Sequence, residues 1–456
     1  MIREKTGYDV VIVGGGLGGL ETGALLAQAK ARMLVLERRN ILGGRAMTVE
    51  QKGFVLNYGL HYMMGGYESP HYRILRQIGK ADQVAFAPMD TAKIFRLRGG
   101  KLHRVPASTE DMMTTELLSL EGKMALTGAM TSLFQADVEG LWNVPLNEWL
   151  NQNVNETSLR QFLLDLAGPT AFAAEPGLMS TGHFLTETRK ILTANGPLAI
   201  YPAGGWGALS EACRQVIEAA GGEVRTGVRV SGLKIEENGV SGVWTGDNQG
   251  SLIPTRAVVL ALPPGEIVPL VRDHSLPDLS ADRLERIHPV RGIAVNLGFM
   301  GVPNHEIATI EMPEDNATSG FHNLFQPQLA PENGLLFQGL RWLTGDQKAD
   351  ESEIRRTEEM FLTRLSTLFP GIREQVVLRR TLIRDVVLGA DHLYDQPRTD
   401  LPPVKVASVE GLYLVGDATD APGELSATVG ESALLCAQHI QEQAARQPEW
   451  SLAARM

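Results

Sequence analysis

Residues 10–20 read Val10-Val11-Ile12-Val13-Gly14-Gly15-Gly16-Leu17-Gly18-Gly19-Leu20, and they constrain the architecture of this chain more than any other segment. The four β-branched residues at the start predict a strand that is buried on both faces, as in the centre of a parallel sheet. Gly14, Gly16 and Gly19 fill a G-x-G-x-x-G turn, and the alanine- and leucine-rich residues 20–31 predict a helix after it. In such a turn the first glycine permits the tight bend, the second lets the backbone approach a pyrophosphate, and the third lets helix and strand pack closely. The segment therefore predicts a dinucleotide whose pyrophosphate lies at the helix N-terminus.

The spacing of the glycines is weak evidence alone, because 48 of the 456 residues are glycine. The context strengthens it. A second apolar strand, residues 33–36, ends at Glu37, about twenty residues beyond the loop, where a carboxylate can accept hydrogen bonds from a ribose. The alternatives are a glycine-rich turn of another α/β protein and an ordinary carboxylate at the end of a strand. The combination favours nucleotide binding.

Composition narrows the class of protein. A hydrophobic content of 43% with 21% charged residues is typical of a soluble globular protein, and 456 residues suffice for two or three domains. The net charge of −11 argues against a nucleic-acid partner and disfavours a broadly basic membrane-binding face. Only Cys213 and Cys436 are present, without metal-ligand spacing, which predicts a reducing compartment and no metal site. No apolar run reaches 18 residues and no signal peptide is apparent, so we expect a cytoplasmic protein, with peripheral membrane contact as an open alternative.

Further strand and helix patterns recur far along the chain. A glycine-rich loop at residues 204–207 precedes a predicted helix, and another helix is predicted near the C-terminus. The patterns predict helices at residues 208–220 and 428–444, and strands at 223–226, 228–235, 239–244, 257–262 and 412–415. The intervening stretches show helix-like periodicity with many methionines and aromatics. The simplest organisation is a discontinuous nucleotide-binding domain (residues 1–75, 196–290 and 386–456) interleaved with a substrate domain (residues 76–195 and 291–385).

Together these segments resemble the FAD-dependent oxidoreductases of the phytoene desaturase and flavin amine oxidase superfamily. The resemblance rests on Gly14–Gly19, Leu36-Glu37-Arg38, Leu42-Gly43-Gly44-Arg45, residues 201–205, 221–224 and 228–243, and the C-terminal residues 412–430. It implies an α/β fold in which a Rossmann-like FAD-binding domain is interleaved with an α+β substrate domain. It also implies FAD as the cofactor and gives little information about the substrate.

The resemblance assigns roles to individual residues. Arg45 would supply a cation near the pyrophosphate or flavin, Asp417 would accept a hydrogen bond from the ribityl chain, and the backbone near Val230 would contact the adenine. The helix beginning near Thr428 would direct its positive end at the flavin. The residues implied to contact FAD are Gly14, Gly16, Leu17, Gly18, Gly19, Glu37, Arg38, Gly44, Arg45, Gly59, Leu60, His61, Val230, Gly416, Asp417, Thr428 and Val429. The alternatives are a surface ion pair for Arg45 and a helix cap for Asp417.

His61 is the candidate catalytic residue, because an imidazole titrates near neutrality and the resemblance places this segment near the flavin. It could equally pack beside the cofactor without taking part in catalysis. Other candidates for a proton-transferring group are Glu175, His183, Tyr201 and Glu424.

An apolar, methionine-rich stretch at residues 112–134 could line a site for a lipid chain, contact a bilayer surface, or form the core face of a helix. We therefore expect hydride transfer between flavin N5 and a lipophilic isoprenoid or acyl-like substrate. Two alternatives remain: an amine oxidase-like oxidation of a C–N bond, and a non-redox lipid-binding module of the escort type. The sequence gives no indication of the oligomeric state.

Overall fold

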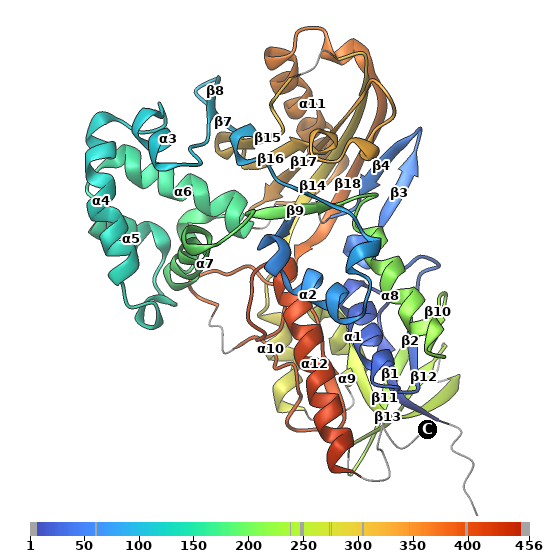
Figure 1. Ribbon diagram of the computed structural model, residues 1–456. Coiled ribbons are helices and arrows are strands. Elements are labelled where there is room, and N and C mark those ends of the chain that lie inside the picture. The colour runs from blue at the N-terminus through green and yellow to red at the C-terminus, as the bar shows by residue number, and fades with distance from the viewer. Residues whose placement is uncertain are drawn as a thin grey trace, which may run out of the picture.

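The computed structural model describes residues 7–59, 62–237, 239–246, 250–272, 274, 276–302, 305–345, 347–396 and 400–447. These residues contain two seven-stranded sheets and a group of helices to one side of them (Figure 1). The α/β architecture expected from the sequence is confirmed. The boundaries of the two expected domains stay a prediction.

The first sheet contains the N-terminal strand. Its spatial order is β10 (Glu223–Arg225), β2 (Met33–Leu36), β1 (Tyr8–Val13), β13 (Ser251–Leu260), β12 (Gly239–Thr245) and β11 (Val230–Glu236), with β19 (Leu412–Leu414) also paired to β13. The pairs among β10, β2, β1, β13 and β19 are parallel, and β11, β12 and β13 pair antiparallel. Strand β1 lies in the middle of the sheet, so Val10, Val11 and Ile12 are completely buried. The double-sided burial follows directly from the run of apolar residues.

Helices cover both faces of this sheet. On one face α1 (Leu17–Gln28) packs beside α8 (Gly207–Ala219) and α12 (Ser426–Arg446), over a core that includes Ile12 and Trp206. On the other face lie α9 (Pro264–Val271) and α10 (Ala281–Glu285). The helix expected at residues 20–31 begins three residues earlier, at Leu17, so Gly18 and Gly19 of the glycine motif lie in its first turn. The strand expected at 257–262 begins earlier, because its first half pairs with β12.

The second sheet contradicts one expectation. It contains, in order, β18 (Val376–Leu388), β14 (Val290–Met300), β17 (Gly334–Leu343), β16 (Ala317–Phe321), β15 (Thr309–Met312), β7 (Ile94–Arg98) and β8 (Lys101–Arg104). The helix-like periodicity expected for residues 291–385 is wrong for most of that stretch, where the described residues form only one α-helix, α11 (Glu351–Leu368). The strand period was visible in Ile293, Val295, Leu297 and Phe299, which alternate along β14 and are all completely buried.

The remaining helices form a lobe beside the second sheet (Figure 1). They are α3 (Thr109–Thr114), α4 (Leu120–Gln135), α5 (Leu146–Asn153), α6 (Thr157–Ala171) and α7 (Thr181–Thr193). Their core includes Leu133, Trp149 and Phe162. The short strands β5 (Met63–Met64), β9 (Ala199–Pro202) and β6 (Phe86–Pro88) form a small sheet, β3 (Thr48–Gln51) pairs with β4 (Phe54–Asn57), and α2 (Pro70–Gln77) packs on α12. None of the helices in the described part of the chain is long and apolar enough to span a bilayer.

Candidate functional site

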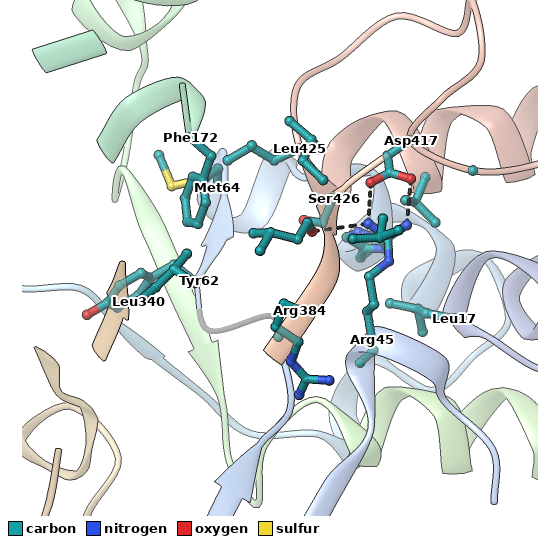
Figure 2. Close-up of a pocket in the computed structure, with 18 of the residues that line it drawn as sticks. Leu17, Arg45, Tyr62, Met64, Phe172, Leu340, Arg384, Asp417, Leu425 and Ser426 are labelled. Carbon is teal, nitrogen blue, oxygen red and sulfur yellow. Dashed lines mark hydrogen bonds and ion pairs between the residues drawn. The ribbon is translucent and has the colours of Figure 1, made fainter. Parts of the chain in front are cut away.

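One large cavity runs from the glycine turn after β1 to the helical lobe, with a volume of about 2120 Å³. Ordinary small-molecule pockets measure about 300–1,000 Å³. The cavity is therefore large enough for an extended cofactor and a second ligand. Figure 2 shows Leu17, Arg45 and Asp417 on one side of the view and Tyr62, Leu340 and Phe172 on the other, with Arg384, Leu425 and Ser426 between them.

The three glycines of the turn have different surroundings. A Cβ atom on Gly14 would lie 2.5 Å from the carbonyl oxygen of Ala261, and one on Gly19 would collide with the carbonyl oxygen of Gly14. A Cβ on Gly16 would meet no atom within 4 Å. Gly16 is also the N-cap of α1, whose first-turn N–H groups have no acceptor within the helix. The turn is thus closely packed at Gly14 and Gly19 and open at Gly16, next to the positive end of a helix.

Glu37 is held in a fixed position at the end of β2. One carboxylate oxygen accepts from the N–H of Gly15 and the other from the N–H of Arg39, each at 2.8 Å. A carboxylate has about four acceptor sites, so both oxygens keep capacity for ribose hydroxyl groups.

Most residues expected to contact the cofactor line this cavity. They are Gly14, Gly16, Leu17, Gly18, Gly19, Glu37, Arg38, Gly44, Arg45, Gly59, Val230, Gly416, Asp417 and Val429. Thr428 is buried behind the wall and is not part of the lining. Leu60 and His61 lie outside the described residues, so the catalytic role of His61 stays a prediction. The other candidate proton-transferring groups, Glu175, His183, Tyr201 and Glu424, do not line the cavity.

Arg45 and Asp417 form an ion pair. Two hydrogen bonds of 2.5 Å join the guanidinium to the carboxylate, which also accepts from the N–H of Gly389 at 2.7 Å. Burial opposes ionisation of Asp417, but the charge and hydrogen bonds of Arg45 outweigh burial and lower its pKa. The Arg45 side chain is 35% exposed, whereas that of Asp417 is only 7% exposed. Neither residue therefore presents an unbalanced charge, which differs from the separate roles that the resemblance implied.

The start of α12 also lines the cavity. The helix begins at Ser426, two residues before the expected start, after Leu425 adopts a φ of +53°. Ser426 and Val429 are among the lining residues, and Figure 2 shows Leu425 and Ser426 near the Arg45–Asp417 pair. The positive end of the helix dipole favours an anionic group at this place.

Sequence reasoning missed Arg384, in the middle of β18. Its guanidinium and that of Arg380 lie 4.7 and 4.4 Å from the centre of the Tyr58 ring, and Arg384 donates to the carbonyl oxygen of Tyr58. Burial and the nearby charges of Arg380 and Arg39 lower the pKa of Arg384 to about 10. Within the described residues Arg384 and Arg39 form no ion pair, and the Arg384 Nε atom is buried without a hydrogen-bond partner. This lining favours a bound anion.

A second missed feature is a polar network beside Tyr62. The amide nitrogen of Gln338 donates to the Asn57 carbonyl at 3.2 Å and to Asn296 Oδ1 at 2.7 Å, so its oxygen accepts from His322 Nδ1 at 3.1 Å. This assigns the His322 proton to Nδ1. Burial lowers the pKa of His322 to about 4, so the imidazole is neutral near pH 7. His322 and Tyr62 both line the cavity, and their rings meet edge to face at 5.1 Å.

The end of the cavity inside the helical lobe is mainly apolar, although Thr127, Thr131 and Thr188 of the same helices also line the cavity. We refer to the apolar side chains at this end as the apolar annex. Its side chains are Ile94, Met112, Leu126, Met130, Phe134, Phe162, Leu166, Phe172, Ile191, Leu192 and Leu340. Glu311 also lines the cavity, and its carboxylate accepts from the buried Arg96 guanidinium at 2.7 and 2.9 Å. Asp385 of β18 lines the same cavity with an exposed side chain that forms no ion pair within the described residues.

Comparisons with known proteins agree with these features. The sequence model of the family "Flavin containing amine oxidoreductase" matches residues 17–441. Prolycopene isomerase 1 of an Oncidium hybrid cultivar is 23% identical over 96% of this chain and 84% of its own length. A limonene dehydrogenase polypeptide of Castellaniella defragrans is 48% identical over 74 residues, which cover 16% of this chain and 14% of that protein. The crystal structure of an oxidoreductase from Methanosarcina mazei has a TM-score of 0.77 with 21% identity, covering 94% of this chain and 99% of the other.

The cavity passes a test of fit for FAD, the cofactor of this family. Open space at Gly16 faces the end of α1, the Arg384 nitrogen lacks a partner, and Glu37 stands at the expected ribose position. The backbone of the glycine turn and the arginines would hold the pyrophosphate, and the start of α12 would face the flavin.

Proposed function

Because the chain belongs to the family of flavin-containing amine oxidoreductases, we propose that it is a dehydrogenase or desaturase of a lipophilic substrate. The protein is an FAD-dependent oxidoreductase, and the proposal concerns its substrate and reaction. An isoprenoid or acyl-like chain would be the substrate, and a C–H bond would be the reacting bond. When bound, the flavin accepts or donates a hydride at N5.

The apolar annex is the observation that carries this proposal. Its methionine, leucine and phenylalanine side chains line the same cavity as Tyr62, and two of them, Phe172 and Leu340, lie on the same side of the view as Tyr62 in Figure 2. Flexible methionine side chains adapt to a long hydrocarbon. Burial of each methylene in such a site contributes about 0.8 kcal/mol, so an extended chain gains much of its affinity there.

Charge argues against an amine substrate. A protonated amine among the annex side chains would need a carboxylate there. Glu311 is already paired with Arg96, and burial raises its pKa, which disfavours its charged form. The neutral His322 adds no negative charge. The names of two relatives, prolycopene isomerase and limonene dehydrogenase, also refer to isoprenoid compounds, which supports the lipophilic alternative.

Anaerobic reduction of the bound flavin tests the proposal. The FAD-loaded protein is mixed with isoprenoid hydrocarbons and linear acyl chains of increasing length, and with primary amines of matched length. We expect the flavin absorbance at about 450 nm to decrease with a lipophilic compound and to stay unchanged with the amines. Reduction by the amines alone would refute the proposal.

A pair of variants on one helix locates the substrate. Met130 of α4 lines the annex, whereas Met124 of the same helix is 68% exposed. Burying an amide without a partner costs about 1–3 kcal/mol, so Met130→Gln should raise the half-saturating substrate concentration about tenfold. Met124→Gln should leave it unchanged. Equal effects of both substitutions would place the substrate elsewhere.

A further inference from the structure

Two histidines and a glutamate meet behind the wall of the cavity. His183 is in the first turn of α7, His392 is in the segment after β18, and Glu424 is two residues before α12. Figure 1 shows α7 close to the N-terminal end of α12, which is the end that carries Glu424. None of the three side chains lines the cavity, so the proposed substrate does not account for them.

The geometry of the cluster is compact. The two imidazole rings stack with centroids 3.9 Å apart and planes inclined by 14°. Nε2 of His183 contacts Oε2 of Glu424, and Nε2 of His392 lies 3.7 Å from Oε1 of the same carboxylate. One donor atom from each residue lies within 4.8 Å of the other two. A metal ion with bonds of about 2.0–2.2 Å holds its donor atoms about 3–4 Å apart. His183 Nε2 and Glu424 Oε2, which are in contact here, would separate on metal binding, and the imidazoles would rotate out of their parallel stack so that both nitrogens point at the ion.

The backbone holds the donors in place without a ligand. The N–H of His183 donates to the Ser180 hydroxyl at 3.3 Å, and the N–H of Ser180 donates to the His392 carbonyl at 2.9 Å. A bridge between Met179 and Leu393 joins the same two segments. The side chains of His183 and Glu424 are 6% and 8% exposed, and that of His392 is 21% exposed. The site is thus buried and still accessible from the His392 side.

The charge around the cluster favours a cation. Both carboxylate oxygens of Glu424 are buried without a hydrogen-bond partner, and no lysine or arginine among the described residues forms an ion pair with this side chain. A divalent ion would supply the positive charge that balances this carboxylate.

We propose that His183, His392 and Glu424 bind a divalent transition-metal ion. Two imidazole nitrogens and one carboxylate are a donor set typical of zinc and of non-haem iron, and such a set leaves coordination positions open to water. His183 and His392 are 209 residues apart in sequence, and His392 and Glu424 are 32 residues apart, so no short sequence motif predicts the site. The proposal stands on this geometry and is independent of the proposed substrate.

Zinc titration of the full-length, FAD-loaded protein tests the proposal. The protein is first treated with a chelator, then incubated with Zn²⁺ alone and desalted before elemental analysis. We expect one zinc ion per chain and a higher melting temperature with zinc than without it. No retained zinc and no change in melting temperature would overturn the proposal and leave a cluster of contacting side chains without a metal.

Variants distinguish this site from adventitious binding. His392→Ala removes one ligand, and Glu424→Gln keeps the shape of the side chain while removing its charge. Each should weaken zinc binding about 100-fold or more, since even the loss of outer partners costs about 10–100-fold. His103→Ala is the matched control, because His103 forms a 3.3 Å pair with the exposed Glu116 and belongs to no group of three possible metal ligands within the described residues. Unchanged zinc affinity in either ligand variant would assign the ion to another place and overturn the proposal.

Discussion

Replacing Gly16 with alanine separates cofactor binding from protein stability. The added Cβ would meet no atom within 4 Å, and the backbone at Gly16, with φ −71° and ψ 172°, suits alanine. The free energy of unfolding of the flavin-free protein should therefore change by less than about 0.5 kcal/mol. The FAD pyrophosphate, however, needs the space that the methyl group would fill. Overpacking costs about 1–3 kcal/mol, which corresponds to FAD binding weakened about 5–150-fold.

Two measurements and two control variants make this prediction specific. Urea unfolding gives the stability of the flavin-free protein, and quenching of flavin fluorescence gives the Kd for FAD. Gly128→Ala is the control in α4, where the Cβ also meets no atom within 4 Å, and it should leave the Kd unchanged. Gly19→Ala should lower stability, because its Cβ collides with the Gly14 carbonyl. A wild-type Kd in Gly16→Ala would refute the placement of the pyrophosphate at this turn.

Three further substitutions probe the charged and polar parts of the site. Asp417→Asn removes the anion that pairs with Arg45 and should lower the free energy of unfolding by about 2–3 kcal/mol, as measured by chemical denaturation. The loss should be smaller than for a fully buried pair, because the Arg45 side chain is 35% exposed. An unchanged denaturation midpoint would contradict this prediction. Arg384→Met should weaken FAD binding about tenfold and reduce its dependence on salt, as titrations at two ionic strengths would reveal. His322→Gln should flatten the pH dependence of stability between about pH 4 and 6.5. The folded pKa of His322 is lowered to about 4, so the unfolded chain binds the proton first and wild-type stability falls as the pH drops through this range. Parallel stability curves for the two proteins would refute this assignment.

Much of the nucleotide-binding part could be predicted from the sequence, because local patterns encode it. The run Val10–Val13 predicts burial on both faces, and β1 lies in the middle of its sheet. Gly14 and Gly19 have no room for a side chain, as the turn motif requires. The sequence signals for these features are local runs and spacings, although the close packing at Gly14 also involves the distant Ala261.

The rest of the site depends on contacts between distant residues. Arg45 and Asp417 are 372 residues apart, and the sequence suggested a separate role for each. The folded chain brings the two side chains together as an ion pair. Arg384 lies on a strand whose alternation was masked by the arginines at 379 and 380, and the stretch was expected to be helical. His322 becomes notable only because burial keeps it neutral beside Gln338. A single sequence gives no indication of which distant residues will pair with a side chain or bury it.

The start of α12 links the two parts of the molecule that carry our proposals. Leu425, in the left-handed region at φ +53°, lies between Glu424 and Ser426. The side chains of these two neighbours point to opposite sides of the turn. Ser426 faces the cavity, where the helix dipole favours negative charge, and Glu424 faces the two histidines. A β-carbon makes this backbone conformation costly, so the surrounding contacts must hold it. The carboxylate of Glu424 contacts His183 of α7 and lies 3.7 Å from His392 in the segment after β18, and these two segments are themselves joined through Ser180. We therefore expect substitutions in this cluster to change the position of the helix end that lines the cavity.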